Sequence, residues 1–395
     1  MAVFNRLGAQ PRYAWFDGNA IALLENGQAY FPALAAAIDA AHREVLLQTY
    51  IFAPDDTGHF IAEALKRAAA RGVKVRVLVD GFGGRTFVRG LQDELTAAGV
   101  EVLIFRPELR LFPLRRRLRR LHRKLAVIDS RIAFVGGINI VDDFGAEAPA
   151  HPRYDYAVRV EGELLQPIVA ASRRLWRLVA WASLRRPQGH IRDDIAAQPA
   201  GTVRAAFLVR DNLRHRNDIE NAYLDAIANA REEIVLASAY FFPGRRFRHA
   251  LLDAAARGVK VTLLLQGLPD HPVMLHATRA LYPFFLEHGI RVFEYRKSLL
   301  HAKVAVIDSH WATVGSSNID PLSLLMAREA NVAVDDPGFA AALKSSLAAA
   351  MREGATELRR EDRARLTCLR RIVCWMAYQI LRLATGMAGH GKYSG

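Results

Sequence analysis

The chain has very little cysteine. Its 395 residues include two, Cys368 and Cys374, both close to the C-terminus. Six positions apart on a helix, the two thiols would point to different faces, so we expect no disulfide and a reducing compartment. Residues 1–16 also lack an apolar core followed by a cleavage site, which argues against a secretion signal.

Metal-binding patterns and long apolar runs are missing as well. No cysteine, histidine or carboxylate cluster has the spacing of a metal site, so we expect no metal and no other cofactor. The longest apolar part of the C-terminal region, residues 372–380 within 366–383, is too short to span a bilayer. Flanked by arginines, it could instead lie in a membrane interface.

The chain has fewer acidic than basic residues. The chain has 40 Asp and Glu against 54 Lys and Arg, a net charge of +14 and a pI near 10.1. Such a balance favours acidic partners, either nucleic acid or an anionic membrane, and charge alone does not choose between them. A hydrophobic content of 51% with mean hydropathy near zero indicates a folded protein, and the length fits two domains.

One eighteen-residue stretch occurs twice. Residues 301–318 repeat residues 122–139 at a constant offset of 179, with eleven of the eighteen positions identical. The shared positions are His122, Lys124, Asp129, Gly136 and Asn139 in the first copy, and His301, Lys303, Asp308, Gly315 and Asn318 in the second. Two copies of one motif predict two halves that share one task.

Each copy places a histidine beside a lysine. The apolar runs on either side of the aspartate predict two short buried strands joined by a turn. Because side chains at i and i+2 of a strand share a face, His122 should project with Lys124, and His301 with Lys303.

This pairing suits chemistry on a phosphate diester. A histidine nitrogen can attack phosphorus while lysines hold the charge on the non-bridging oxygens. Two copies supply a nucleophile and an acid, so the two pKa values should be pushed apart and the pH–rate profile should be bell-shaped. We expect His122 to be the nucleophile and His301 the acid, although the symmetry of the motif leaves the reverse open.

The pattern H-x-K-x4-D followed by G-S-x-N resembles the phospholipase D superfamily, and its duplication resembles the lipid-acting members. Further segments are similar to bacterial cardiolipin synthases of the B type: residues 25–27, 70–75, 209–212, 239–244 and 313–323. The resemblance implies two phospholipase D-like α/β/α domains with mixed sheets, related by a pseudo-twofold axis, with the active site at their interface.

The resemblance also implies supporting residues. Asp155 and Glu329 each open an apolar strand, and acids in this place are expected to hydrogen-bond a histidine ring and fix its tautomer. Ser316, Asn139 and Asn318 are expected to hold the phosphate or support the site. The first copy has Gly137 where the second has Ser316, so the site should be asymmetric. Asp129 and Asp308 belong to the motif, but their turn positions suggest that they brace it rather than touch substrate.

Alternating strands and helices argue independently for an α/β fold. We expect these elements, first for one half and then for the other: strands 20–24, 44–52, 73–79 and 100–105 with helices 30–43, 60–71 and 87–98; strands 234–242, 259–266 and 290–295 with helices 218–231, 246–257 and 272–288. The Pro- and Gly-containing connector 186–201 predicts domains 1–195 and 196–355, followed by a basic amphipathic tail, 356–395.

An insertion precedes the first motif. The two halves align at an offset of 186 over residues 68–75 but of 179 at the motifs, and residues 106–121 are the most unusual segment. A membrane surface explains their leucines better than nucleic acid does, at about 1 kcal/mol per basic residue near an anionic bilayer. The expected membrane-binding residues are Phe112, Leu114, Arg115, Arg116, Arg117, Arg119 and Arg120. A solvated basic loop is the alternative.

Taken with the resemblance, these features predict a phosphatidyltransferase that makes cardiolipin on the cytoplasmic face of a bacterial inner membrane, as a peripheral protein. Phosphatidylglycerol, or alternatively phosphatidylethanolamine, would donate the phosphatidyl group to phosphatidylglycerol through a phosphatidyl-histidine. Three alternatives stay open: a phospholipase D that hydrolyses head groups, a nuclease of the superfamily, and a non-catalytic membrane-binding protein. The leucine-rich insertion argues against nucleic acid, and the sequence does not indicate an oligomeric state.

Overall fold

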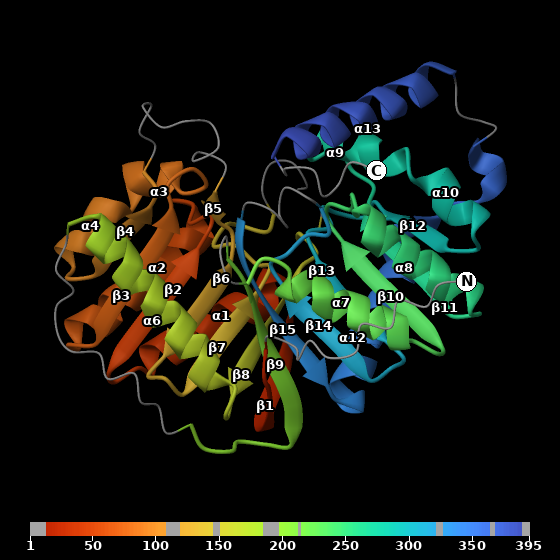
Figure 1. Ribbon diagram of the computed structural model, residues 1–395. Helices are drawn as coiled ribbons and strands as arrows, with labels where there is room; N and C mark the ends of the chain where they lie inside the picture. The colour runs from red at the N-terminus through yellow and green to blue at the C-terminus, as the bar shows by residue number, and fades with distance from the viewer. Residues whose placement is uncertain are drawn as a thin grey trace.

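The computed structural model describes residues 13–107, 119–144, 151–184, 197–211, 215–320, 327–363 and 368–388. Over these residues the strands join into one mixed sheet (Figure 1). The first half contributes, in spatial order, β4 (Glu101–Phe105), β3 (Lys74–Asp80), β2 (Glu44–Thr49), β6 (Lys124–Ile128), β7 (Ile132–Gly136), β8 (Tyr156–Glu161) and β1 (Trp15–Glu25).

The second half repeats this order in reverse. It continues from β1 with β9 (Val203–Arg210), β15 (Ala327–Asp335), β14 (Trp311–Gly315), β13 (Lys303–Ile307), β10 (Glu233–Ser238), β11 (Lys260–Gln266), β12 (Arg291–Tyr295) and β16 (Ala355–Glu357). The antiparallel pair β1 and β9 joins the halves, and the short strand β5 (Arg120–Leu121) pairs with β15 across them. The predicted α/β fold with mixed sheets is confirmed.

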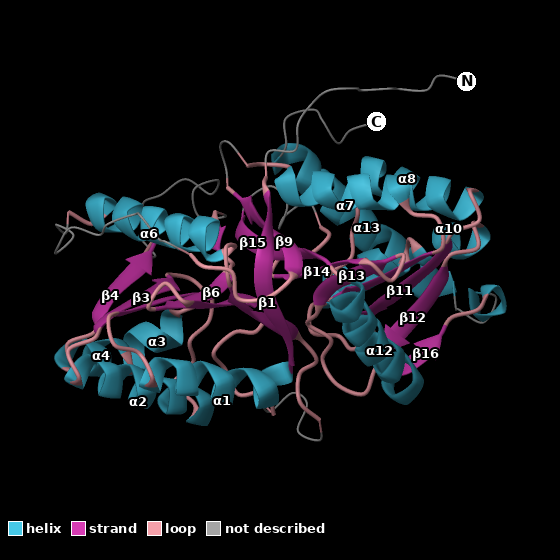
Figure 2. Cartoon of the chain, turned by 90° about the horizontal axis from the view of Figure 1, so that it is seen from below, coloured by secondary structure: helices cyan, strands magenta, loops and turns pink. Residues whose placement is uncertain are grey.

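Helices cover the sheet on both faces. The first half has α1 (Asn26–Asp39), α2 (Asp56–Ala70), α3 (Arg85–Gly90), α4 (Gln92–Ala97) and α6 (Leu165–Ala182). The second has α7 (Asp218–Asn229), α8 (Arg245–Ala256), α9 (Pro272–Arg279), α10 (Tyr282–Glu287), α12 (Pro337–Gly354), the short 3-10 helix η1 (Arg360–Arg363) and α13 (Cys368–Ala388). Figure 2 shows α1 and α2 on one face of the first half and α6 on the other, and likewise α7 and α8 opposite α12 in the second half.

Local signals explain where several helices begin and end. Asp55 caps α2 by accepting a hydrogen bond from the Gly58 backbone N–H at 2.8 Å. Gly72 and Gly258 follow α2 and α8 with φ of +84° and +92°, a conformation that glycine adopts without a steric penalty. The sequence predicted that these two helices end at residues 71 and 257, directly before the glycines.

A single apolar core joins the two halves. Its buried members include Val158 of β8 and Ile168 of α6 from the first half, and Val332 of β15 and Leu343 of α12 from the second. Fully burying a side chain of this size stabilises the fold by about 1.5–3 kcal/mol. The halves are therefore held together as tightly as the interior of one domain, which fixes the two motifs relative to each other.

Two helices that were predicted as continuous are each broken in the structure. The helix expected over 87–98 is broken into α3 and α4, and the one expected over 272–288 is broken into α9 and α10. Gly90, a poor helix former, ends α3, and Pro283 sits in the first turn of α10, where proline is favoured. The predicted domain boundary near residue 195 lies at the edge of the connector outside the described residues and stays a prediction.

The basic stretch at residues 173–181 lies in α6 and packs one face of this helix against the core. Leu175, Trp176 and Val179 are buried against strands of the first half, and the Arg76 guanidinium lies 5.5 Å from the centre of the Trp176 ring. A helix with arginines and tryptophans can pack in a core or lie on a membrane; the structure shows core packing for one face of α6, while Leu178 and Trp181 on its other face are exposed.

Candidate active site

Each histidine is placed by a backbone carbonyl of the opposite half. The backbone N–H groups of His122 and Arg123 both donate to the Arg328 carbonyl, at 3.0 and 2.8 Å. In the second half the His301 N–H donates to the Tyr154 carbonyl at 2.8 Å. The residue after each of these carbonyls is an acid, so this pairing brings a carboxylate to each histidine.

Each histidine is therefore paired with a carboxylate from the other half. His122 Nδ1 lies 3.0 and 3.1 Å from the two carboxylate oxygens of Glu329, and His301 Nδ1 lies 2.6 Å from Asp155 Oδ2. Both acids are buried. Since Nδ1–H donates to a carboxylate, the other ring nitrogen, Nε2, keeps the lone pair that a nucleophile or base requires. Neither half holds a complete histidine–acid pair of its own.

The two lysines lie beside the histidines, buried from water. Lys124 Nζ donates to the His122 carbonyl at 2.6 Å and lies 5.5 Å from the centre of the Tyr50 ring. Lys303 Nζ lies 2.9 Å from His301 Nδ1 and 3.7 Å from Asp155 Oδ2. Both motif lysines thus lie where their cations can meet an anion bound between the histidines.

Burial changes the protonation of these groups. It lowers the pKa of Lys124 to about 7 and that of Lys303 to about 8, and Lys303 adds to the effect at Lys124. Burial also lowers the pKa of His122, and together with Lys303 it lowers the pKa of His301 well below its ordinary value. A bound phosphate diester would raise all four pKa values, because an anion favours the protonated forms.

The motifs differ where the sequence has Gly137 and Ser316. The Ser316 hydroxyl donates to Glu329 Oε2 at 2.5 Å and so holds the acid that orients His122. A Cβ at Gly137 would lie 2.3 Å from Asp155 Oδ1, so the first half has no room for a serine there. The shorter Asp155 is packed against Gly137, whereas the longer Glu329 is held by a hydroxyl.

The asparagines are buried beside the motifs. Asn139 Oδ1 accepts a hydrogen bond from the Ile51 N–H at 3.2 Å, which ties the first motif to the segment that carries Tyr50. The Asn318 side chain is equally buried. A role for either in holding phosphate stays a prediction.

The motif aspartates are turned away from the histidines. Asp129 accepts hydrogen bonds from the N–H groups of residues 42–44, at 2.8–2.9 Å, and Asp308 from those of residues 231–233, at 2.8–3.0 Å. Each follows its strand, at the end opposite the lysine, in a turn with φ near +50°. These backbone contacts are those of a bracing residue, as their turn positions suggested, and a catalytic role for Asp129 and Asp308 stays a prediction.

Sequence comparison relates the chain to known proteins. A family model described as "Cardiolipin synthase, PLD-like domain" matches residues 34–143 and 223–351. The chain belongs to that family. It is 44% identical to cardiolipin synthase B of Escherichia coli K12, covering 85% of this chain and 81% of that protein, and 43% identical to cardiolipin synthase B of Salmonella typhi, covering 84% and 80%.

More distant relatives share the fold of this family. A cardiolipin synthase of Geobacillus kaustophilus is 32% identical over 78% of this chain and 62% of that protein. Phosphatidylserine synthase from Haemophilus influenzae superposes with a TM-score of 0.66 at 14% identity, covering 93% of this chain and 94% of that one. The likeness extends to polyphosphate kinase from Porphyromonas gingivalis, with a TM-score of 0.57 at 18% identity over 86% and 49%.

Several residues around this phospholipase D-like site were not predicted from the sequence. Asp80, at the carboxyl end of β3, is buried and accepts a hydrogen bond from the Leu121 N–H at 2.7 Å, which anchors the chain next to His122. The Tyr50 ring lies 5.0 Å from the His122 ring, and the positive charge of Arg153 helps lower the pKa of His301. A position at the carboxyl end of a parallel strand was the one signal available for Asp80.

Most of the predicted membrane-binding residues cannot be placed. Phe112, Leu114, Arg115, Arg116 and Arg117 lie outside the described residues. Arg119 is exposed, whereas Arg120 is partly buried, with its guanidinium 4.7 Å from the centre of the Phe82 ring and 3.9 Å from Asp80. Arg120 therefore contributes to the packing around Asp80.

Two kinds of structure are absent from the described residues. No group of three or more histidine, cysteine or carboxylate side chains gathers there as metal ligands would. Within the same residues, no helix combines the length and apolar character needed to cross a bilayer.

Proposed function

We propose that the protein is a cardiolipin synthase that transfers a phosphatidyl group between phospholipids through a histidine. The observation that carries this proposal is the pair of partly buried histidines, each held at Nδ1 by a buried carboxylate from the other half and flanked by buried lysines. The identity to cardiolipin synthases over most of the chain supports the choice of substrate class.

In the first step, Nε2 of one histidine attacks the phosphorus of phosphatidylglycerol. A P–N bond forms, and the P–O bond to the head group breaks. The second histidine gives its proton to the departing oxygen, so glycerol leaves as a neutral alcohol. Lys124 and Lys303 stabilise the charge on the two non-bridging oxygens.

In the second step, a head-group hydroxyl of another phosphatidylglycerol attacks the phosphatidyl-histidine. The second histidine, now neutral, takes the hydroxyl proton, a new P–O bond forms and the P–N bond breaks. Two phosphatidylglycerol molecules thus yield one cardiolipin and one glycerol. Phosphatidylethanolamine as donor would release ethanolamine by the same steps.

The assignment of His122 as nucleophile and His301 as acid stays a prediction. The stronger lowering of the pKa at His301 favours a neutral His301 and hence the opposite assignment. Trapping of the covalent intermediate decides between them.

We further infer that the protein acts as a peripheral protein on the cytoplasmic face of a bacterial inner membrane. Its net charge of +14 suits an anionic surface, and phospholipid substrates reside there. The apolar outer face of α13, described below, supports contact with the bilayer.

The test is to incubate the purified protein with phosphatidylglycerol liposomes, with and without phosphatidylethanolamine, and to identify the products by mass spectrometry. We expect cardiolipin from the wild type and none from His122→Ala or His301→Ala. Phosphatidic acid without cardiolipin would make the protein a hydrolase of head groups instead.

A further inference from the structure

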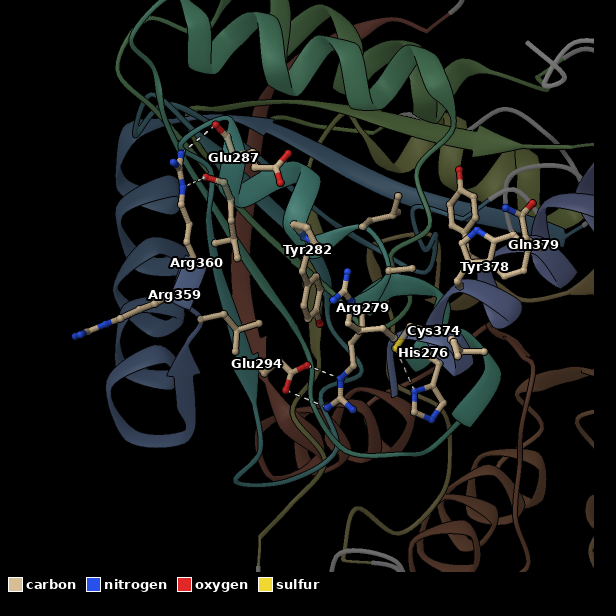
Figure 3. A pocket seen from close by; sticks show the side chains of 18 of the residues that line it. His276, Arg279, Tyr282, Glu287, Glu294, Arg359, Arg360, Cys374, Tyr378 and Gln379 are labelled. Atoms are coloured by element: carbon tan, nitrogen blue, oxygen red, sulfur yellow. Dashed lines mark hydrogen bonds and ion pairs between the residues drawn. The ribbon is translucent and has the colours of Figure 1, made fainter. Parts of the chain in front are cut away.

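A cavity of about 1150 Å³ lies beneath α13, apart from the two motifs. Its walls come from α9, α10, β12, the segment around η1 and α13 itself (Figure 3). Cavities that bind small molecules measure about 300–1,000 Å³, so this one has room for a ligand of substantial size. Neither motif contributes a residue to its walls.

Much of the lining is apolar. Leu281, Pro283 and Leu286 line it on the side of α10, and Ile372 and Trp375 on the side of α13. An apolar wall of this extent fits a hydrocarbon chain, whose transfer from water is favourable by about 0.8 kcal/mol for each CH₂ group buried.

Positively charged residues predominate among those that line the cavity. Five arginines line it, against two carboxylates, Glu287 and Glu294. Glu294 is buried and already bound by two of them: Arg279 donates to its oxygens at 2.7 and 3.0 Å, and Arg296 also bonds to it. Among the residues that line the cavity, arginines therefore outnumber carboxylates, and guanidinium groups bind phosphate oxygens well.

The cavity adjoins an exposed apolar surface of α13. One stripe of α13 exposes Leu369, Met376, Ile380 and Leu383, which are 46–71% exposed, while Ala377 and Leu381 on its opposite side are buried against the protein. Ile372 and Trp375 belong both to this exposed stripe and to the cavity lining. An exposed apolar helix face next to arginines is typical of a helix that lies in a bilayer interface.

We propose that this cavity binds one anionic phospholipid from the bilayer, as a site separate from the catalytic histidines. An acyl chain lies along the apolar wall, and the phosphate lies at the arginine-rich rim, where Arg371 of α13 is exposed. The proposal rests on the proposed function only in taking the bilayer as the protein's surroundings.

The cavity wall is connected to the second motif. Arg279 donates to the Gly267 carbonyl at 3.3 Å, and the neighbouring Gln266 donates to the Leu300 carbonyl at 3.4 Å, directly before His301. A lipid held here would therefore stabilise the strands behind His301 while it anchors the protein to the membrane.

Cys374 provides a probe, because it lines the cavity with its Sγ 3.7 Å from His276 Nδ1. We would measure alkylation of Cys374 by N-ethylmaleimide in the full chain carrying Cys368→Ser and His301→Ala, so that no turnover occurs. Dihexanoyl-phosphatidylglycerol, below its micelle concentration, should slow alkylation about elevenfold at ten times its Kd. Dihexanoyl-phosphatidylcholine should protect far less.

Two variants test the location of the lipid. Arg371→Glu should remove the protection by reversing a charge at the rim, and Ala280→Phe should remove it by filling the cavity. Arg352→Glu makes the same change of charge on α12, outside the cavity, and should leave the protection intact, as should Lys303→Met in the catalytic site. Circular dichroism would confirm that each variant is folded.

Equal protection by both lipids, or none by either, would overturn the proposal. Protection that Lys303→Met removes would place the lipid in the catalytic site, and protection without lipid that is lost on removal of residues 389–395 would make the tail the occupant. Because the probe protein is inactive, this result does not depend on whether cardiolipin is made.

Discussion

At the scale of single residues, the two acids that each hold a histidine of the other half, Glu329 and Asp155, should affect catalysis most. We predict that Glu329→Gln and Asp155→Asn each lower kcat by about 10²–10⁴-fold, because an amide can hold the imidazole in the wrong tautomer while leaving the fold intact. Cardiolipin formation by each purified variant, with the melting temperature as a check on folding, measures this effect.

Ser316→Ala is the matched control for Glu329. It removes one hydrogen bond to the acid but leaves the acid in place, so we expect a loss of activity well below that of Glu329→Gln. Equal losses for the two variants would contradict the view that Glu329 acts directly on His122 and that Ser316 only positions it.

The contact between Gly137 and Asp155 leads to a second prediction. A Cβ at Gly137 would lie 2.3 Å from Asp155 Oδ1, so Gly137→Ala should displace the carboxylate from His301 and lower kcat more than it lowers stability. The neighbouring glycine serves for comparison. Gly136→Ala would press on the backbone of β8, with 2.5 Å to Ala157 Cα, and should mainly lower the melting temperature.

The buried lysines predict how stability depends on pH. The pKa of Lys124 is about 7 in the folded protein and 10.5 in the unfolded chain, so the unfolded state binds more protons between these values. The free energy of unfolding should therefore rise with pH across that window, by up to about 1.4 kcal/mol per pH unit for this one group.

Lys124→Met should remove this contribution. The variant should lose activity, become more stable than the wild type near pH 7, and show a flatter dependence of stability on pH. Denaturant unfolding at several pH values between 7 and 10 measures the slopes. Parallel slopes for the wild type and the variant would show that Lys124 keeps its ordinary pKa in the folded state.

Much of the site could be predicted from the sequence because its groups lie in a repeated local pattern. His122 and Lys124 are two residues apart on one strand, as are His301 and Lys303, so their association needs only strand geometry. The crossing of the acids could not be predicted. It depends on backbone pairing between residues far apart in the chain, such as His122 with Arg328 and His301 with Tyr154.

At the scale of elements, the motif aspartates brace the turns that precede β2 and β10. Asp129→Ala leaves the N–H groups of residues 42–44 without their acceptor, and Asp308→Ala does the same to residues 231–233. We predict a loss of about 1–3 kcal/mol in unfolding free energy for each, with little change in kcat per folded molecule.

Thermal unfolding and kinetics of the same samples check this prediction. A hundredfold loss of kcat at an unchanged melting temperature would return the aspartates to the catalytic machinery. Each aspartate belongs to the sequence motif, but it lies at the opposite end of the strand from the histidine. Membership of the motif therefore does not imply contact with the substrate.

Most elements followed from apolar periodicity and from glycine stops, and their order in the two halves followed from the repeat. The breaks at Gly90 and near Pro283 were missed because the apolar pattern continues through them. Residues Leu165–Ala182 form α6, and a helix with arginines and tryptophans can pack in a core or on a membrane; the structure buries Trp176 in the core and leaves Trp181 exposed.

At the scale of the whole molecule, net charge and the exposed stripe of α13 predict binding to anionic membranes. The protein should cosediment with phosphatidylglycerol liposomes more than with phosphatidylcholine liposomes, and less as salt screens the charges. Ile380→Asp with Leu383→Asp should weaken cosedimentation.

Phe60 of α2, another exposed apolar residue, provides the control. Phe60→Asp should leave cosedimentation unchanged because α2 lies in the other half, away from α13. Equal weakening by Phe60→Asp and by the α13 variant would show that the contact with the membrane is not made by α13.

The central claim is that one histidine carries the phosphatidyl group between two lipids. The most direct test mixes the protein with phosphatidylglycerol, quenches it in base to preserve the P–N bond, and searches the peptides containing His122 and His301 for the added mass. We predict a phosphatidyl adduct on one of the two and on neither in the corresponding alanine variant. Cardiolipin formation with no adduct on either histidine would contradict the account.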